Sequence, residues 1–151
     1  MIRTCWRLIP VLVLVVVLAA CQTADDPPRG PNRPSGAENK AEMARVVEQA
    51  RGLGQVIDVR GVYETSLTTS GQTDLIATVP EGTPPARTQE LADELIALIW
   101  RSRIDPITTM GATVVLPGGD PSRGSLAGRG ISGSDGGFDR LAQKLGPRPT
   151  G

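Results

Sequence analysis

One stretch of the chain, from Gln89 to Arg103, has a residue pattern typical of an amphipathic helix. Its apolar side consists of Leu91, Ala92, Leu95, Ile96, Leu98 and Ile99, and its polar side of Gln89, Glu90, Asp93 and Glu94. The acids fall in the expected first turns and Arg101 and Arg103 in the last, which is the order that a helix dipole favours. Thr83 before Pro84, or Thr88 before Gln89, is the candidate N-cap.

Asp105-Pro106 ends this helix, because the residue before a proline avoids the helical conformation. Trp100 lies at the helix end beside Ile99. We expect it to be a lid on the core whose ring N–H donates to a main-chain carbonyl, as buried tryptophans commonly do, rather than a platform for a ligand.

Three segments have the composition or the period of β-strands. From Gln55 to Thr65 the period is two and one side is wetter, since Asp58, Arg60 and Glu64 share it. A second run, Asp74 to Val79, follows the turn signal Ser70-Gly71 and predicts a hairpin whose register stays open. A third strand is expected between Ile107 and Leu116.

Two further helices are expected, one on each side of this region. Helical spacing of five apolar residues predicts a helix from Glu38 to Arg51, which Gly52 and Gly54 can stop. Those five are Met43, Val46, Val47, Ala50 and Leu53. A short helix near the carboxyl end would dock on the domain through Phe138, Leu141, Ala142 and Leu145, with Gly146-Pro147 ending it.

Eight glycines lie between positions 118 and 137, a composition typical of loop or disorder, with a weak edge strand at Leu126 to Ile131 as an option. Gly128 to Gly133 spells G-x-G-x-x-G, the dinucleotide fingerprint. It lacks a clear preceding strand, a long following helix and an acid some twenty residues on, so we treat it as a chance match.

The order of elements predicts an α+β fold. We expect a small three-stranded antiparallel or mixed sheet packed on helices over residues 37–117, followed over 118–151 by a glycine-rich loop and a short helix. A sheet covered on one side leaves a threonine-rich face and at least one free edge, where a partner can add.

The amino end reads as an export signal over residues 1–20, with Arg3 and Arg7 before an apolar run from Leu8 to Ala20. That run has thirteen residues, whereas a membrane span needs about 20. Leu18-Ala19-Ala20-Cys21 then resembles the lipobox of bacterial lipoproteins: leucine, two small residues and cysteine. A chance cysteine after a secretory signal and an uncleaved anchor are the alternatives that we rank below it.

The resemblance implies that a diacylglyceryl group is attached to the Cys21 sulfur and that signal peptidase II cuts between Ala20 and Cys21. The protein would then be anchored to the cell membrane by lipid, facing outside the cytoplasm. Two acyl chains give a stable anchor where one gives a marginal one. The ending LGPRP, from Leu145 to Pro149, resembles that of some small exported domains of high-GC bacteria. This resemblance covers fewer than ten residues and implies no function.

Residues 21–36 would be the lipidated cysteine and a disordered tether. Four prolines fall between Gln22 and Gly36, and no apolar side chain there is larger than that of Ala24. Such a segment buries too little to offset its ordering entropy. In polyproline geometry it reaches at most roughly 47 Å, at about 3.1 Å per residue.

Composition excludes several kinds of chemistry. The chain has no histidine, which removes Ser-His-Asp and Cys-His catalysis and histidine-bound zinc. Cys5 lies inside the signal segment, so lipidation of Cys21 would remove the only thiol of the mature chain. Lys40 and Lys144 stand on expected solvated helix surfaces, outside an S-x-x-K frame. We therefore expect no cofactor, no metal and no catalytic residues.

Charge also bears on the partner. The chain has 16 basic and 16 acidic residues, and loss of Arg3 and Arg7 leaves a net charge of −2. Nucleic acid is thereby disfavoured, since phosphate binding needs a strongly basic surface. The leading hypothesis is a lipid-anchored, non-catalytic binding or accessory module that holds another envelope protein. The alternatives are a carrier of a small apolar ligand or lipid, held between helix and sheet, and a hydrolase that uses Glu64, Asp74 and Asp93.

Overall fold

The computed structural model describes residues 33–65 and 71–149. The signal segment, the cleavage site at Ala20 and Cys21, the tether up to residue 32 and the turn residue Ser70 lie outside the described residues. Among the described residues, no helix has both the length and the apolar character that crossing a membrane requires.

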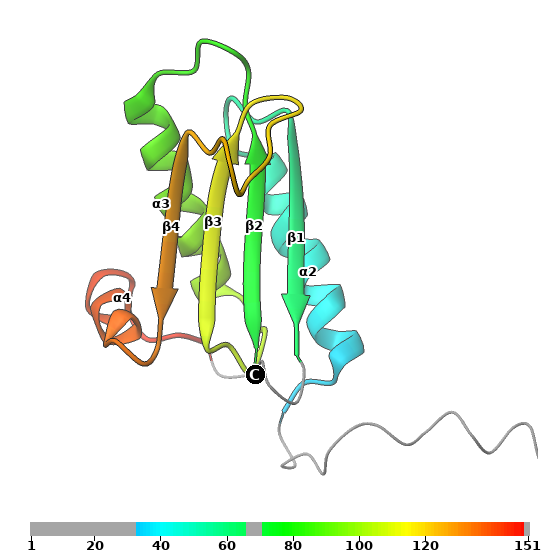
Figure 1. Ribbon diagram of the computed structural model, residues 1–151. Coiled ribbons are helices and arrows are strands. Elements are labelled where there is room, and N and C mark those ends of the chain that lie inside the picture. Colours follow the sequence, from blue (N-terminus) through cyan, green and yellow to red (C-terminus); the bar gives the residue numbers. More distant parts are fainter. Residues whose placement is uncertain (1–32, 66–70, 150–151) are drawn as a thin grey trace, which may run out of the picture. The chain divides into compact units, whose positions relative to one another are not determined.

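Four strands form one mixed sheet in the order of the sequence (Figure 1). Strands β1 (Asp58–Glu64) and β2 (Gln72–Thr78) are antiparallel, which confirms the predicted hairpin. Strand β3 (Thr109–Val115) is parallel to β2, and β4 (Ala127–Ser132) is antiparallel to β3. The α+β class and the mixed sheet are as expected.

The prediction of three strands is wrong, because β4 comes from the glycine-rich segment. In β4 the residues opposite buried positions of β3 are Ala127, Arg129 and Ile131, and two glycines alternate with them. A glycine has no side chain to show the two-residue period, so the pattern supports this strand only weakly. The optional edge strand at Leu126 to Ile131 is confirmed by β4. Main-chain pairing with β3 supplies what the side chains do not.

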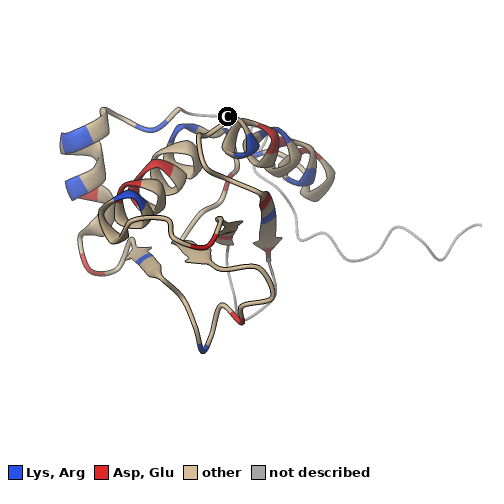
Figure 2. Ribbon diagram, turned by 90° about the horizontal axis from the view of Figure 1, so that it is seen from above, with Lys and Arg blue, Asp and Glu red and all other residues tan. Residues whose placement is uncertain are grey.

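The helices α2 and α3 cover one face of the sheet, and Figure 2 shows them together on one side of the strands. Helix α2 (Gly36–Arg51) packs on β1. Helix α3 (Pro85–Arg101) crosses from β2 to β3 and packs on β3 and β4. The core between the two layers is built from residues such as Leu75, Leu91, Leu95 and Ile99, all without exposed surface or nearly so.

The start of α3 differs from the expectation. The helix begins at Pro85, and its N-cap, Pro84, makes no side-chain hydrogen bond. The hydroxyls of Thr83 and Thr88 donate instead to the carbonyls of Pro80 and Pro85. Neither threonine therefore caps the helix. Pro85, at the first helical position, presets the backbone angle there, and no acid lies in the first turn.

Helix α2 begins earlier than its apolar spacing indicated. Ser35 is its N-cap and forms a capping box with Glu38: the Glu38 N–H donates to Ser35 Oγ at 3.1 Å, and the Ser35 N–H donates to Glu38 Oε2 at 2.6 Å. Ser35 and Gly36, placed at the end of the expected tether, are therefore part of the helix start.

Helix α4 (Gly137–Leu145) packs beside β4, as its four apolar residues predicted. Trp100 is 4% exposed, and its Nε1 donates to the Gly146 carbonyl at 3.0 Å. Its ring meets that of Phe138 edge to face, with centroids 5.7 Å apart. The expected role of Trp100 as a lid on the core is confirmed.

Candidate functional site

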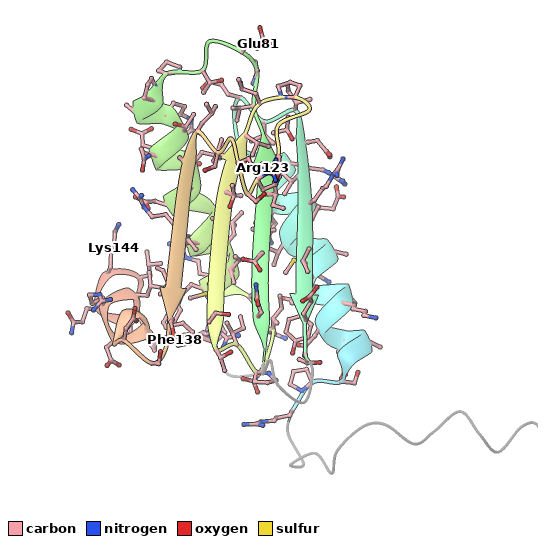
Figure 3. All side chains as sticks on the ribbon, viewed as in Figure 1. Glu81, Arg123, Phe138 and Lys144 are labelled. Atoms are coloured by element: carbon pink, nitrogen blue, oxygen red, sulfur yellow. The ribbon has the colours of Figure 1, made fainter. Side chains whose placement is uncertain are left out.

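The sheet has one face that neither α2 nor α3 covers, and we call it the open face. Figure 3 views the sheet from this side. Strand alternation and register place on it residues from all four strands. They are Asp58, Arg60, Val62, Glu64, Gln72, Asp74, Ile76, Thr78, Thr109, Gly111, Thr113, Val115, Gly128, Gly130 and Ser132.

The two halves of the open face differ in relief. The β1 and β2 half carries charged and branched side chains, including Val62 and Ile76, whereas β3 and β4 contribute mostly glycine and threonine. A Cβ added at Gly130 would meet no atom within 4 Å. Part of this face is therefore nearly flat, with accessible backbone.

Asp74 is held flat near the middle of the open face. It lies opposite Gly111 in the register, and its carboxylate occupies the space where a Cβ on Gly111 would stand. Gln72 Nε2 donates to Asp74 Oδ2 at 2.8 Å. The missing side chain of Gly111 is thus what lets the carboxylate lie across β3.

The three carboxylates of the hydrolase hypothesis do not meet at one place. Glu64 and Asp74 share the open face on neighbouring strands. Asp93 lies on α3, on the other side of the sheet, and accepts from Arg129 Nε at 2.7 Å. Among the described residues, no group of three acidic, histidine or cysteine side chains could hold a metal ion.

The connection from β3 to β4, residues 116–126, borders the open face at one end. Val115 points to this face yet is 3% exposed, and Gly119 lies close to its Cβ. Figure 3 shows Arg123 of this connection in front of the sheet. Within the connection, the hydroxyl and N–H of Ser122 donate to Asp120 Oδ1, and these bonds lower the pKa of Asp120.

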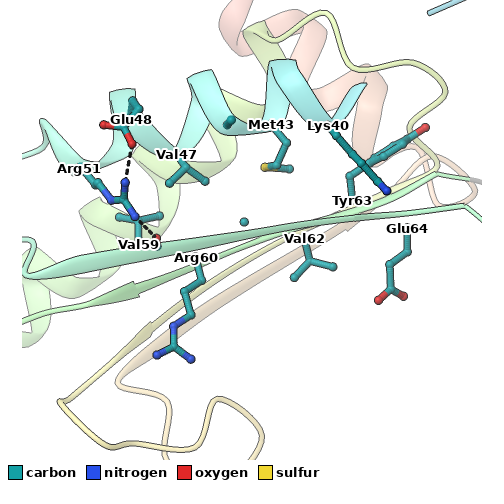
Figure 4. Close-up of a pocket in the computed structure, with 12 residues that line it drawn as sticks. Lys40, Met43, Val47, Glu48, Arg51, Val59, Arg60, Val62, Tyr63 and Glu64 are labelled. Carbon is teal, nitrogen blue, oxygen red and sulfur yellow. Dashed lines mark hydrogen bonds and ion pairs between the residues drawn. The ribbon is translucent and has the colours of Figure 1, made fainter. Parts of the chain in front are cut away.

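A groove of about 690 Å³ lies between α2 and the outer side of β1 (Figure 4). Met43 and Val47 line it from the helix, and Gly61 forms part of its floor. A Cβ at Gly61 would stand 2.5 Å from Met43 Sδ and 2.6 Å from Val47 Cγ2. Glycine at this position therefore permits the close approach of α2 to β1.

A second groove, of about 420 Å³, runs along α3 and is lined by Leu53, Ala97, Leu98 and charged residues. Both grooves open to solvent. The carrier hypothesis, which expected an apolar ligand between helix and sheet, finds its best space in the groove beside β1.

The outer edge of β1 has no strand beyond it among the described residues. The Val59 carbonyl accepts from Arg51 Nη2 of α2 at 3.5 Å, so it points outward from the sheet. Backbone groups of alternate residues point to the same side of a strand, so Gly61 and Tyr63 also direct their N–H and C=O outward. At the other edge of the sheet, α4 packs beside β4.

A cluster of polar groups that the sequence analysis did not single out lies at the end of β1. Asn39 of α2 contacts Tyr63 and Asp105, and the Tyr63 hydroxyl lies 3.4 Å from the Pro106 carbonyl. Burial raises the pKa of Tyr63, and Asp105 adds to the rise. The one signal in the sequence is that Asn39, a polar residue, lies at helical spacing from Met43, Val46 and Ala50, on the side of the helix that faces the core.

Arg148, near the carboxyl end, belongs to the same region. Its Nε and Nη2 are buried without a hydrogen-bond partner. Burial lowers the pKa of Arg148, and the charges of Asp105 and Tyr63 act in the opposite direction. The cluster thus brings together segments from both ends of the described chain.

Comparison with known protein families, with curated proteins and with solved structures found no match for this chain. Lys40 and Lys144 are both exposed, as predicted.

Proposed function

We propose that this chain is a lipid-anchored, non-catalytic binding module of the cell envelope, which holds another envelope protein against its open face. The observation that carries the proposal is the four-stranded sheet with helices on only one side. Apolar Val62 and Ile76 stand on its β1 and β2 half, and the flat area around Gly130 lies on its β3 and β4 half. A partly apolar, shallow face suits a protein surface better than a small molecule, which needs a concave pocket.

The anchor part of the proposal follows from the lipobox resemblance at Leu18 to Cys21. It is tested by changing Cys21→Ala, and separately by inhibiting the lipoprotein peptidase, with cell fractionation and acyl labelling as readouts. We expect the unchanged protein in the membrane fraction, carrying acyl label, and the variant unlabelled. An intact mass free of fatty acid, or one that still contains the first twenty residues, would overturn the anchor.

The binding part is tested by capture from envelope extracts of the source cell with the full chain. Thr113→Arg places a long charged side chain in the middle of the open face, and Gln143→Arg makes the same charge change on exposed α4. We expect a reproducible partner with the unchanged chain and with Gln143→Arg, and its loss with Thr113→Arg. Equal capture by all three, or no reproducible partner, would contradict this use of the open face.

A carrier of a small apolar ligand is the second candidate, because Met43 and Val47 line the groove beside β1. Native mass spectrometry of the purified chain tests it, and the absence of a co-purifying ligand would count against it. The third candidate, a carboxylate hydrolase, has the weakest support because Asp93 lies away from Glu64 and Asp74. An activity screen with each of the three changed to Ala tests it.

A further inference from the structure

The groove between α2 and the outer edge of β1 combines a strand edge with a partly apolar wall. We propose that this groove binds an extended peptide segment of another protein, which adds to β1 as an antiparallel strand beneath the outer side of α2. The inference goes beyond the function proposed above, because it concerns a different surface and requires neither the lipid anchor nor a partner on the open face.

The edge of β1 favours an occupant that has a main chain of its own. Gly61 and Tyr63 direct their N–H and C=O groups outward, and no strand lies beyond them in the part of the chain that the structure describes. The Val59 carbonyl is already used, since it accepts from Arg51 Nη2 at 3.5 Å. An added strand can therefore exchange main-chain hydrogen bonds with two residues, Gly61 and Tyr63. A purely apolar ligand has no groups that could do so.

Helix α2 restricts the occupant to a single strand. Helix α3 packs on two strands, β3 and β4, whereas α2 packs on the edge strand β1. The outer side of α2 projects beyond this edge, and its exposed Lys40, Ala44 and Glu48 line the groove. A partner strand that carried its own helix on this side would collide with α2. The overhang therefore favours one extended segment over the edge of another helix-covered sheet, including that of a second copy of this chain.

Two residues of the added strand would point their side chains towards α2, namely those opposite Gly61 and Tyr63. Gly61 has no side chain and that of Ala44 is small, so an apolar side chain opposite Gly61 would lie beside Ala44 and the half-buried Val47. Figure 4 shows Lys40 and Tyr63 at the same end of the groove. An acidic side chain opposite Tyr63 would therefore meet the ammonium group of Lys40.

The other side of the added strand would meet Arg60, Val62 and Glu64, which point away from α2 (Figure 4). Opposite charges and apolar pairs directly across strands are stabilising, so acidic, apolar and basic residues fit opposite these three in turn. Arg60 is available for such a pair. Its side chain is 82% exposed, and its ion pair with Asp58, at 3.7 Å, is of the weak, exposed kind.

The two sides together define a residue pattern and a direction. Read from its amino end, the added strand is basic, acidic, apolar, apolar and acidic, and it runs antiparallel to β1 from Glu64 to Arg60. A peptide of this sequence that ran parallel to β1 would bring its basic residue to Arg60 and its last acid to Glu64, and like charges across strands repel.

Titration of the full chain in detergent solution with a synthetic peptide tests the proposal. The probe is lysine, glutamate, valine, valine and glutamate, with acetylated and amidated ends. We expect saturable binding that Ala44→Glu weakens about tenfold or more, because a charged side chain then stands where the second valine would lie. Ala41→Glu makes the same change at an exposed position of α2 outside the groove, and Thr113→Arg changes the open face; neither should alter the affinity.

Modified peptides test the strand pairing. The N–H of the second valine, opposite Gly61, would donate to β1, whereas the N–H of the first valine, opposite Val62, would point away from it. An N-methyl group on the second valine should therefore abolish binding, and one on the first should leave it nearly unchanged. Arg60→Glu should weaken binding about tenfold, and a peptide with lysine in place of its last glutamate should restore it.

Four results would each overturn the proposal. They are no binding up to about 1 mM peptide, equal effects of Ala44→Glu and Ala41→Glu, equal effects of the two N-methyl groups, and loss of binding with Thr113→Arg. The last result would place the peptide on the open face. Because Thr113→Arg also disrupts the surface of the function proposed above, it distinguishes failure at the groove from failure at the open face.

Discussion

Asn39, in the first turns of α2, is joined to Asp105, in the segment before β3, by two hydrogen bonds. Asn39 Nδ2 donates to the Asp105 carbonyl at 2.7 Å, and the Asp105 N–H donates to Asn39 Oδ1 at 3.0 Å. The same Nδ2 lies 3.0 Å from the hydroxyl of Tyr63. Asn39 is 2% exposed, so one buried amide links α2, β1 and the entry to β3.

Asn39→Ala should destabilise the fold by about 1–3 kcal/mol, because it leaves main-chain groups of the partly buried Asp105 without these partners. Urea unfolding measures the change. Gln49→Ala, at an exposed position of the same helix, should change the free energy of unfolding by less than about 0.5 kcal/mol. Equal effects of the two changes would show that the amide does not tie the three segments together.

Tyr63 should titrate above pH 10, since burial and the negative charge of Asp105 raise its pKa, while the Asn39 hydrogen bond and Arg148 oppose the rise in part. It is the only tyrosine in the chain, so phenolate absorbance against pH reports this group alone. A midpoint at or below 10 in the folded protein would contradict the burial of the hydroxyl.

The same shift predicts how stability depends on pH. Above about pH 10 the unfolded chain loses the tyrosine proton before the folded chain does. The contribution of Tyr63 to the free energy of unfolding is therefore fully present below pH 10, and it is lost as the pH rises through the folded-state pKa of Tyr63. Tyr63→Phe should therefore make the free energy of unfolding fall less steeply at alkaline pH. If it falls as steeply as in the unchanged chain, groups other than Tyr63 cause the decline.

Gly61→Ala should destabilise the fold by about 1–3 kcal/mol, because the new methyl group would overlap Met43 and Val47. Gly130→Ala makes the same change in a strand where a Cβ meets nothing within 4 Å, and it should change stability by less than about 0.5 kcal/mol. Chemical denaturation measures both. Val47→Ala in the Gly61→Ala background should recover part of the loss, and a purely additive double variant would argue against the overlap.

Phe138→Ala should loosen α4 without unfolding the sheet. The Phe138 ring contributes about 1–2 kcal/mol through burial and its edge-to-face contact with Trp100, so the amides of α4 should exchange with solvent roughly tenfold faster. Hydrogen exchange resolved by residue is the measurement, and exposed Lys144→Ala in the same helix is the control. If the backbone amides of β2 and β3 exchange faster by the same factor, α4 does not unfold separately from the sheet.

Local patterns account for much of the fold. The apolar stripe of α3 and the alternation of β1 predicted which side of each element faces the core, and Val59, Leu95 and Ile99 are buried accordingly. The start of α2 was missed although it has a local signal: Ser35 and Glu38 have the spacing of a capping box, but the apolar spacing placed the start at Glu38 and left Ser35 in the tether. These features depend on residues close in sequence, where periodicity and capping are decisive.

Other features required the tertiary structure. The pattern of β4 supports an edge strand only weakly, and its pairing with β3 establishes it as a strand. Hydrogen bonds join Asn39 to Tyr63, 24 residues away, and to Asp105, 66 residues away. No local pattern contains such a relation. The close approach of α2 to β1 depends on the missing side chain of Gly61, which the sequence shows only as one more glycine.

The sequence by itself thus determined the types of most elements, their order and their core-facing sides, and it carries the lipobox resemblance on which the proposed location rests. Tertiary structure alone decided that the fourth strand pairs with β3, that β1 lies at an edge of the sheet, and that α2 and α3 pack on the same face. The reason is physical: periodicity records which side of a segment avoids water, whereas the choice of neighbouring segment depends on contacts between residues far apart in the chain.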